Sequence, residues 1–477
     1  MISFLASLIA LVMGYFVYGA FVERIFGIEP SRKTPAYTQE DGVDFIPLSW
    51  PQIFLIQFLN IAGLGPIFGA IMGALYGPAA FLWIVLGSIF AGGVHDYFSG
   101  MLSVRHGGKS ISEIVGVYLG RQVRIIMIAF SFVLLILIGT VFTSGPVGLL
   151  TNLGFTGILA KQNFWLAIIL LYYFIATVVP VDKVIGRIYP LFGAVLLIMA
   201  FSIGFMLLIK GYEIPEITLR SLHPDSQPLW PMLFITIACG AVSGFHSTQS
   251  PIMSRCLPNE TYGRRVFYGA MIAEGVIALI WAAAAMSFFP GGISGLNEVT
   301  VTGGAALVVN DVSLGLLGPL GGILAILGVI VCPITSGDTA FRSARLTVAD
   351  AINLNQKPLK NRLIIAVPIF VMGFGLTLID FSVVWRYFAF SNQVLATIVL
   401  WTSAVYLVKN DKLHWIATLP ATFMTAVVTT YILQAPEGLS LPISISYPIG
   451  IICAAVALFQ FVTIIFSLNS RYENKLN

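Results

Sequence analysis

The sequence predicts an all-α polytopic membrane protein with about thirteen transmembrane helices. Apolar runs of about twenty residues recur along the whole 477-residue chain, and a run of roughly 18 or more can cross a hydrocarbon core about 30 Å thick. Hydrophobic residues make up 58% of the chain and charged residues only 10%, with a mean hydropathy of +0.93. This composition excludes an ordinary soluble domain.

The expected spans follow one another with short connections. The first has no Lys or Arg before it and is too long for the core of a signal peptide, so we expect it to remain as a helix. The spans are expected at approximately Ile2–Val22, Pro51–Leu75, Ala79–Val104, Ile125–Thr143, Phe164–Val181, Ile188–Ile209, Trp230–Ser254, Val266–Phe289, Leu316–Ile334, Leu363–Ile379, Val383–Val408, Leu413–Leu433 and Ile443–Leu468.

The positive charges predict the orientation. Nearly all of the 25 Lys and Arg residues fall in the odd-numbered connections and in the C-terminal tail. Because cytoplasmic loops carry such an excess, we expect these connections and the C-terminus in the cytoplasm and the N-terminus outside. A wrong number of spans would disturb this alternation of basic and non-basic connections, except where the number is wrong by two. The pattern therefore supports thirteen spans.

The second expected span contains a Gly-Leu-Gly-Pro sequence, Gly63, Leu64, Gly65 and Pro66. Glycines recur every four residues from Gly65 onward, which also suits close helix packing. That alternative does not account for the proline, which removes a donor and clashes with a carbonyl one turn earlier. We therefore expect the helix to open here, which a membrane tolerates only where protein or a watery cavity receives the freed polar groups.

The seventh expected span is interrupted in a similar way by "GAVSGFHSTQSP". The two interrupted spans run in opposite directions and lie five spans apart, which predicts two inverted five-helix repeats over residues 51–210 and 230–408. Residues 1–50 then form an extra N-terminal helix and a cytoplasmic loop, and residues 412–477 form two C-terminal helices and a tail. In such proteins the interrupted helices bind the substrate, so the expected binding residues are Gly63, Leu64, Gly65, Pro66, Ser243, Gly244, His246, Ser247, Thr248 and Gln249.

Ionisable residues inside the spans are candidates for coupling to an ion, because a charge costs at least ~2.5 kcal/mol in the membrane. Asp96 either carries a proton or cation, or is a structural carboxylate paired with a basic residue such as Arg105. Glu274 either carries a proton or makes a structural hydrogen bond. His95 and His246 are each either a titrating group or only a hydrogen-bonding residue.

The segment "CPITSGDTAFRSAR" groups Thr335 and Ser336 with Asp338. These hard oxygen ligands suit a small cation, or alternatively they cap the start of an amphipathic helix. The four cysteines are expected to be small core residues, not disulfides or metal ligands. The sequence has no phosphate loop, zinc spacing or nucleophile elbow, so we expect neither an enzyme nor a cofactor.

Six segments together resemble the carbon starvation protein A (CstA) family. They are "TPAYTQEDGVDFIP", "IAGLGPIFG", "GGVHDYFSG", "GKSISEIVG", "SGFHSTQSP" and "CPITSGDTAFRSAR", spread from Thr34 to Arg345. The resemblance implies a bacterial inner-membrane importer of peptides or pyruvate, with a leucine-transporter-type fold and proton coupling. Longer members carry a larger C-terminal region that this chain lacks.

We therefore expect a secondary active transporter that imports a small carboxylate-bearing nutrient by cation symport. The resemblance implies protons as the coupling ion, while the segment around Asp338 leaves sodium open. The expected partners are a small-molecule substrate and the lipid bilayer, without nucleic acid; the sequence does not indicate the oligomeric state. One alternative is a nutrient receptor, which would bind a signalling partner and show no uptake activity. Others are a sodium-coupled amino acid transporter and a channel, and single-channel currents would identify the channel.

Overall fold

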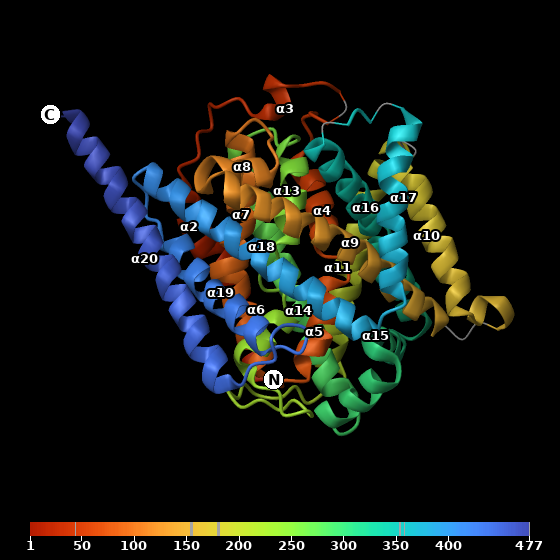
Figure 1. The fold of residues 1–477 in the computed structure, drawn as a ribbon. Helices are drawn as coiled ribbons and strands as arrows, with labels where there is room; N and C mark the ends of the chain where they lie inside the picture. Colours follow the sequence, from red (N-terminus) through yellow and green to blue (C-terminus); the bar gives the residue numbers. More distant parts are fainter. Residues whose placement is uncertain (43, 153–155, 179–181, 353, 357, 477) are drawn as a thin grey trace.

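The computed structural model describes residues 1–476 apart from 43, 153–155, 179–181, 353 and 357, and every regular element within this part of the chain is a helix (Figure 1). This confirms the all-α prediction. By length and composition, ten of the described helices can cross a membrane, or eleven if one bent pair counts as a single span. The count of thirteen stays a prediction, because two further expected spans contain, in the described part of the chain, no single helix long enough to cross a membrane. The fifth is the shorter apolar helix Gln162–Thr177, and the seventh is divided by a break.

The first half of the chain contains one straight N-terminal span followed by a bundle. Its elements are α1 (Ile2–Met13), η1 (Gly14–Tyr18), α2 (Gly19–Phe26), α3 (Pro35–Thr38), α4 (Trp50–Ile61), α5 (Gly65–Ala74), α6 (Ala79–Leu86), η2 (Gly87–Gly92), α7 (Gly93–Arg105), α8 (Ile111–Leu119), α9 (Arg121–Thr151), η3 (Gly157–Ala160), α10 (Gln162–Val178) and α11 (Asp182–Ile209).

The second half begins with the other interrupted span. Its elements are η4 (Leu229–Leu233), α12 (Phe234–Thr236), α13 (Phe245–Ser254), η5 (Glu260–Tyr262), η6 (Arg264–Tyr268), α14 (Gly269–Phe288), α15 (Ile293–Ala325), η7 (Ile326–Val331), α16 (Cys332–Ala351), α17 (Leu359–Thr377), α18 (Phe381–Lys409), α19 (Trp415–Gln434) and α20 (Ile443–Leu476).

Some helices form the centre of the molecule and others its rim. The most apolar windows of Ala79–Arg105, Glu260–Phe288 and Phe381–Lys409 are 83%, 78% and 78% buried, whereas those of Ile2–Phe26 and Ile443–Thr463 are 28% and 22% buried. Figure 1 accordingly shows α7, α13 and α18 in the middle and α20 along one edge. The central helices therefore supply any buried site.

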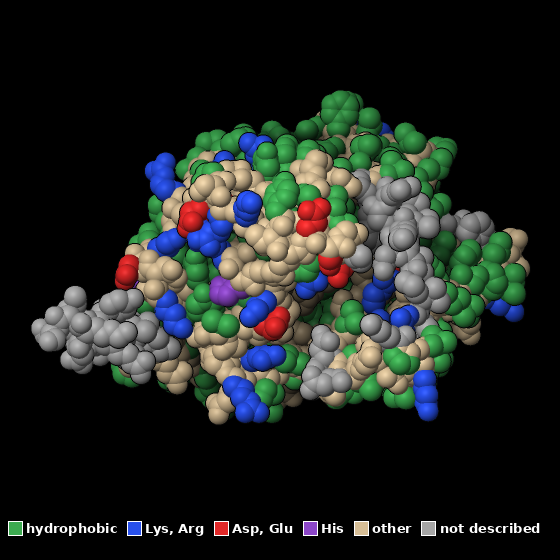
Figure 2. Space-filling model, turned by 90° about the horizontal axis from the view of Figure 1, so that it is seen from above, with side chains coloured by type: hydrophobic (Ala, Val, Ile, Leu, Met, Phe, Trp, Pro, Cys, Tyr) green, Lys and Arg blue, Asp and Glu red, His purple; other side chains and the backbone are tan. Residues whose placement is uncertain are grey.

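The connections expected on one side of the membrane do lie at one end of the molecule. In Figure 1, α3 and α8 are at the top and the N-terminus is at the bottom. Figure 2 views the top end, where Lys and Arg side chains are spread over the surface. The orientation of these ends in the membrane stays a prediction.

The helix α15 shows what the hydropathy pattern missed. The ninth span was expected to begin at Leu316, but helical structure already begins at Ile293. It is kinked at Gly304 and at Gly318, which have φ angles of 66° and 62° that side-chain-bearing residues rarely adopt. Pro319 follows the second kink, so the chain bends there before it continues through η7 into α16.

Candidate functional site

Two membrane spans are broken in the middle of the molecule, where the sequence predicts it. The helices α4 and α5 are separated by Ala62, Gly63 and Leu64 and bend by 49°. In the seventh expected span, the residues between Thr236 and Phe245 are not helical. All of the break residues from Ala62 to Pro66 and from Ile237 to Gly244 are buried, so the structure encloses both breaks.

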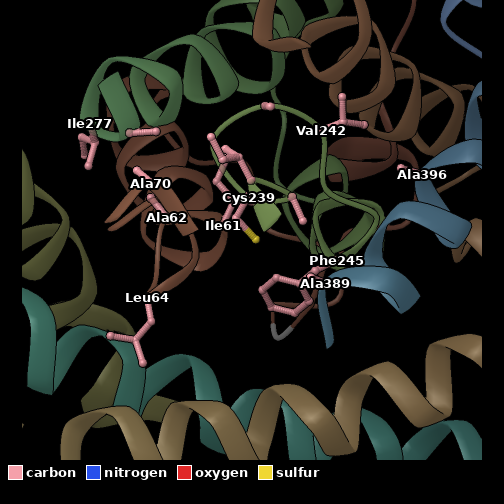
Figure 3. Close-up of a cluster of buried hydrophobic side chains, with 14 of the residues drawn as sticks. Ile61, Ala62, Leu64, Ala70, Cys239, Val242, Phe245, Ile277, Ala389 and Ala396 are labelled. Atoms are coloured by element: carbon pink, nitrogen blue, oxygen red, sulfur yellow. The ribbon is translucent and has the colours of Figure 1, made fainter. Parts of the chain in front are cut away.

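The two breaks lie against each other. A Cβ atom added at Gly65 would overlap the side chain of Cys239, and one added at Gly240 would lie 3.5 Å from the Cα atom of Pro66. Figure 3 shows Cys239 between Ile61 and Ala62, at the end of α4, and Phe245, at the start of α13. Gly240 has a φ angle of 89°, which leaves little choice but glycine. These glycines therefore serve close packing as well as opening the helix.

Side chains of α18 satisfy the backbone at the second break. The Oδ1 atom of Asn392 accepts hydrogen bonds from the N–H of Phe245 (2.8 Å) and the hydroxyl of Ser243 (3.1 Å), and its carbonyl accepts one from the N–H of Gly244 (3.1 Å). The Nε2 atom of Gln393 donates to the carbonyl of Phe234 at 3.1 Å. Both amides are buried, so they replace water at the two helix ends.

Four ionisable side chains form a continuous buried network beside the breaks. Asp96 accepts contacts from His95 Nδ1 (2.7 Å) and from His246 Nδ1 (2.8 Å), one at each carboxylate oxygen. The other ring nitrogen of His246 lies 3.2 Å from an oxygen of Glu274. None of the four side chains is exposed to solvent. His95 and Asp96 come from α7, His246 from the first turn of α13 and Glu274 from α14, so three helices hold the network.

The local structure of α6 to α7 brings Asp96 to this place. The π-helical segment η2 precedes α7, and a Cβ atom at Gly92 would overlap the carbonyl of Ala241 in the second break. Ser88, also in η2, donates a 2.9 Å hydrogen bond to the carbonyl of Gly240. Such π-helical segments are frequent at functional sites, and this one brings α7 into close contact with the open backbone.

This arrangement can store and release a proton. A doubly protonated His246 would donate to Asp96 from one nitrogen and to Glu274 from the other, with two carboxylates facing one imidazolium. Removing the Nε2 proton leaves two carboxylates around a neutral ring, and the charge of the buried group changes by one unit.

Cys239 adds a thiol to the same place. Its sulfur, a ring nitrogen of His246 and an oxygen of Glu274 lie within 4.8 Å of one another, which is close enough for one metal ion. The sulfur also lies 3.4 Å from the hydroxyl of Ser243, to which it can donate. Of the three cysteines whose side chains are described, Cys239 and Cys256 are buried, as expected of core residues, and Cys453 is half-buried.

The hydroxyls predicted to bind substrate on α13 mostly bond to their own helix. Ser247 donates to the carbonyl of Gly244 at 2.6 Å, and Thr248 donates to that of Phe245 at 2.7 Å. Gln249 donates to the Thr248 hydroxyl at 2.9 Å. The first N–H groups of α13 are occupied by Asn392. At the start of α5, Pro66 has no N–H and the N–H groups of Ile67 and Phe68 bond to the carbonyl of Leu64, so the N–H of Gly65 is the better candidate for holding a carboxylate.

Thr335, Ser336 and Asp338 lie elsewhere. All three are buried on α16, which packs against α9 and α10, and Asp338 accepts a 3.0 Å hydrogen bond from the hydroxyl of Tyr172. The interpretation of this segment as a helix cap is wrong, because Asp338 lies inside the continuous helix α16. The predicted ion-coupling residues therefore form two groups, one around His246 and one around Asp338.

The interpretation of Asp96 as a structural carboxylate paired with Arg105 is also wrong. Arg105 instead binds Glu260, with Nε 2.6 Å from a carboxylate oxygen. Sequence reasoning missed Asn392 and Gln393, although two adjacent amides inside an apolar span, in "FSNQVL", were a visible signal. It also missed Trp83, whose indole donates to the carbonyl of Ile237 at 3.0 Å, because a tryptophan in an apolar helix carries no distinguishing pattern.

Comparisons with solved structures agree with this architecture. The chain is similar to Mhp1, a nucleobase-cation-symport-1 family transporter, in a closed conformation, with a TM-score of 0.52, 15% identity, and coverage of 92% of this chain and 96% of that one. The inward-facing conformation of Mhp1 gives a TM-score of 0.50 at 14% identity, covering 93% and 94%. At such low identity the likeness shows the fold alone, which is of the leucine-transporter type.

Comparisons of sequence identify the family. An uncharacterized membrane protein of Haemophilus influenzae is 44% identical over 61% of this chain and 91% of its own length. The peptide transporter CstA of Campylobacter jejuni is 26% identical over 98% and 85%, and the pyruvate/proton symporter BtsT of Escherichia coli is 27% identical over 60% and 49%. The family model for the carbon starvation protein CstA matches residues 1–155, 151–317 and 298–431. The chain belongs to the carbon starvation protein CstA family.

Proposed function

We propose that this protein is a secondary active transporter that imports a small carboxylate-bearing nutrient, a short peptide or pyruvate, by symport with protons. The observation that carries the proposal is the buried network of His95, Asp96, His246 and Glu274 beside two touching helix breaks. Family membership supports it, since relatives are named peptide transporters and a pyruvate/proton symporter. The protein is not proposed to be an enzyme or to use a cofactor.

The proposed architecture has thirteen spans. Residues 51–210 and 230–408 form two inverted five-helix repeats, each beginning with a broken helix, while the first span and the last two lie outside the repeats. The protein would lie in the bacterial inner membrane with its N-terminus outside and its C-terminus in the cytoplasm. Impermeant thiol reagents test this in intact cells: a cysteine replacing Ser226 should be labelled, and one replacing Lys33 should be labelled only after lysis.

In the proposed mechanism, the substrate carboxylate binds at the opened backbone of Gly63 to Pro66, facing the uncapped start of α5. A proton enters the network and completes the imidazolium of His246 between Asp96 and Glu274. The added positive charge offsets the negative charge that the substrate brings. Rocking of one helix bundle against the other then exposes the site to the cytoplasm, where both leave.

Uptake into proteoliposomes tests the proposal. Labelled pyruvate and a labelled dipeptide would be offered with an inward proton gradient, an inward sodium gradient, or neither. We expect concentrative uptake of one of them under the proton gradient alone. Accumulation driven by sodium would instead favour a cation site at Thr335, Ser336 and Asp338, which are buried oxygen-bearing residues. No uptake under any gradient would refute both substrates and favour a receptor.

A further inference from the structure

A groove on the rim of the molecule, outside the candidate site, has an unusual composition. It measures about 630 Å³ and lies between the N-terminal span, α4 and α14. Ten of its eleven lining residues are apolar, aromatic or glycine, and the remaining one is an arginine: Val12, Tyr15, Phe16, Trp50, Pro51, Phe54, Leu55, Arg265, Gly269, Ile272 and Ala273. The size is within the ~300–1,000 Å³ typical of small-molecule pockets.

Arg265 lies in η6, in the connection between α13 and α14 that also carries Arg255 and Arg264. Its guanidinium stacks on Trp50 at 5.2 Å and on Tyr262 at 5.6 Å, and no carboxylate pairs with it among the described residues. The nearest carboxylate, that of Glu23, binds the neighbouring Arg264 at 3.1 Å and interacts with Arg265 only at longer range. Tryptophan and arginine together are typical of the membrane interface, so we expect Arg265 to lie near the depth of lipid head groups.

We propose that the groove binds an anionic phospholipid, with its phosphate on Arg265 and an acyl chain along the apolar wall. Val12 and Phe16 are 48% and 62% exposed, so the groove is open toward the side that faces lipid. A guanidinium can bind a phosphate through two parallel hydrogen bonds, which the stacked geometry of Arg265 leaves available. A single arginine beside an otherwise apolar wall matches an anionic amphiphile.

The walls of the groove belong to elements of the candidate site. The helix α4 is the half-helix that ends at the first break, and its Gln57 donates to Ser250 on α13 at 3.1 Å. The helix α14 presents Ile272 and Ala273 to the groove and carries the fully buried Glu274. A lipid seated here would brace α4 against α14. This consequence for transport rests on the proposed function, whereas the binding itself does not.

Native mass spectrometry of the purified full-length protein tests the binding. Phosphatidylglycerol, phosphatidylcholine and glycerol phosphate would be titrated onto the wild type and three variants. Arg265→Gln removes the charge, Ala273→Phe narrows the groove without changing charge, and Arg24→Gln removes an exposed arginine that lies outside the groove. We expect phosphatidylglycerol to be retained in preference, with about fivefold weaker binding in Arg265→Gln. Ala273→Phe should weaken both lipids, and Arg24→Gln neither.

Three results would overturn the proposal. The first is equal retention of phosphatidylglycerol by the wild type, Arg265→Gln and Ala273→Phe. The second is glycerol phosphate competing as well as the whole lipid, which would mean an anion site without an acyl chain. The third is a lipid-free dimer that Ala273→Phe converts into a monomer, which would make the groove a contact between two copies. Each readout is independent of transport, so a failure here leaves the proposed function to its own test.

Discussion

Asp96 holds the central position in the buried network, because it bonds two histidines at once. We expect Asp96→Asn to abolish accumulation against a gradient and to leave substrate exchange. Asparagine has nearly the same shape, but it cannot supply the negative charge that stabilises protonated His246. Proteoliposomes preloaded with substrate measure exchange, and a proton gradient across empty ones measures accumulation. Accumulation at the wild-type level would remove Asp96 from the mechanism.

Mutation of Cys239 can distinguish a proton-binding site from a metal-binding site, because its sulfur lies close to His246 and Glu274 and could be a metal ligand. We expect Cys239→Ser to retain concentrative uptake, because a hydroxyl keeps the small size of the side chain and can still hydrogen-bond beside His246 and Ser243. Cys256→Ser, at another buried cysteine, is the matched control. Loss of uptake in Cys239→Ser alone, together with a metal ion bound to the purified wild type, would contradict the proton mechanism.

At the residue scale, the sequence indicated the types of group but not their partners. Asp96, His246 and Glu274 were visible as ionisable residues in apolar segments. Their association depends on α7, α13 and α14 meeting, and Asp96 and His246 are 150 residues apart in the chain. Local patterns carry no information about such a contact. By contrast, the local sequence Ser110 to Glu113 has the Ser-x-x-Glu pattern of a capping box, and the structure contains that capping box.

At the scale of elements, Asn392 makes the broken span possible. We expect Asn392→Ala to destabilise the protein by about 1–3 kcal/mol for each buried donor left without an acceptor, namely the N–H of Phe245 and the hydroxyl of Ser243. Thermal unfolding in detergent measures this. Asn410→Ala, at the other end of the same helix, removes only a bond to the carbonyl of Tyr406 and should cost much less. Equal losses would mean that Asn392 does not support the break.

The contact between the two breaks makes a reciprocal prediction. Gly65→Ala should destabilise the protein by roughly 1–3 kcal/mol, because its Cβ would overlap the Cys239 side chain. Adding Cys239→Gly removes the overlapping atoms and should recover most of the stability, since the Cα atom of residue 239 remains 3.8 Å away. Unfolding of the two single variants and the double variant forms a double-mutant cycle. Additive losses would show that the two breaks do not touch.

The positions of the two helix breaks were predictable from the sequence, whereas the side chains that hydrogen-bond to the broken backbone were not. Glycine and proline in Gly63 to Pro66 act on their own backbone, so the interruption can be inferred from four letters. Asn392 acts from another helix, and nothing in its own segment says which backbone it will cap. In α15, the kink at Gly318 and Pro319 lies close to the expected start at Leu316, whereas helical structure begins at Ile293.

At the scale of the whole molecule, one ion-pair cluster joins three parts of the chain. Glu260, before α14, accepts two hydrogen bonds from Arg105 at the end of α7 and one from the N–H of Glu29, at 2.8 Å, in the connection after α2. Arg32 of the same connection lies 3.6 Å from its carboxylate. Glu260 is not exposed, and the side chain of Arg105 is 11% exposed. The cluster therefore ties the N-terminal span to the helices that carry Asp96 and Glu274.

We expect Glu260→Gln to destabilise the protein by up to about 3 kcal/mol, because it removes the nearer of the two carboxylates that pair with the largely buried guanidinium of Arg105. The remaining exposure of Arg105, its bond to the carbonyl of Gly27 and its longer ion pair with Glu29, at 3.5 Å, keep the loss below that of a fully buried pair. Glu298→Gln, at an exposed residue with no ion pair in the described part of the chain, is the control and should unfold like the wild type. Thermal unfolding at low and high salt measures both variants. The deficit of Glu260→Gln should persist at high salt, because a buried pair is screened little; a deficit that disappears with salt would show that the cluster acts only as a surface ion pair.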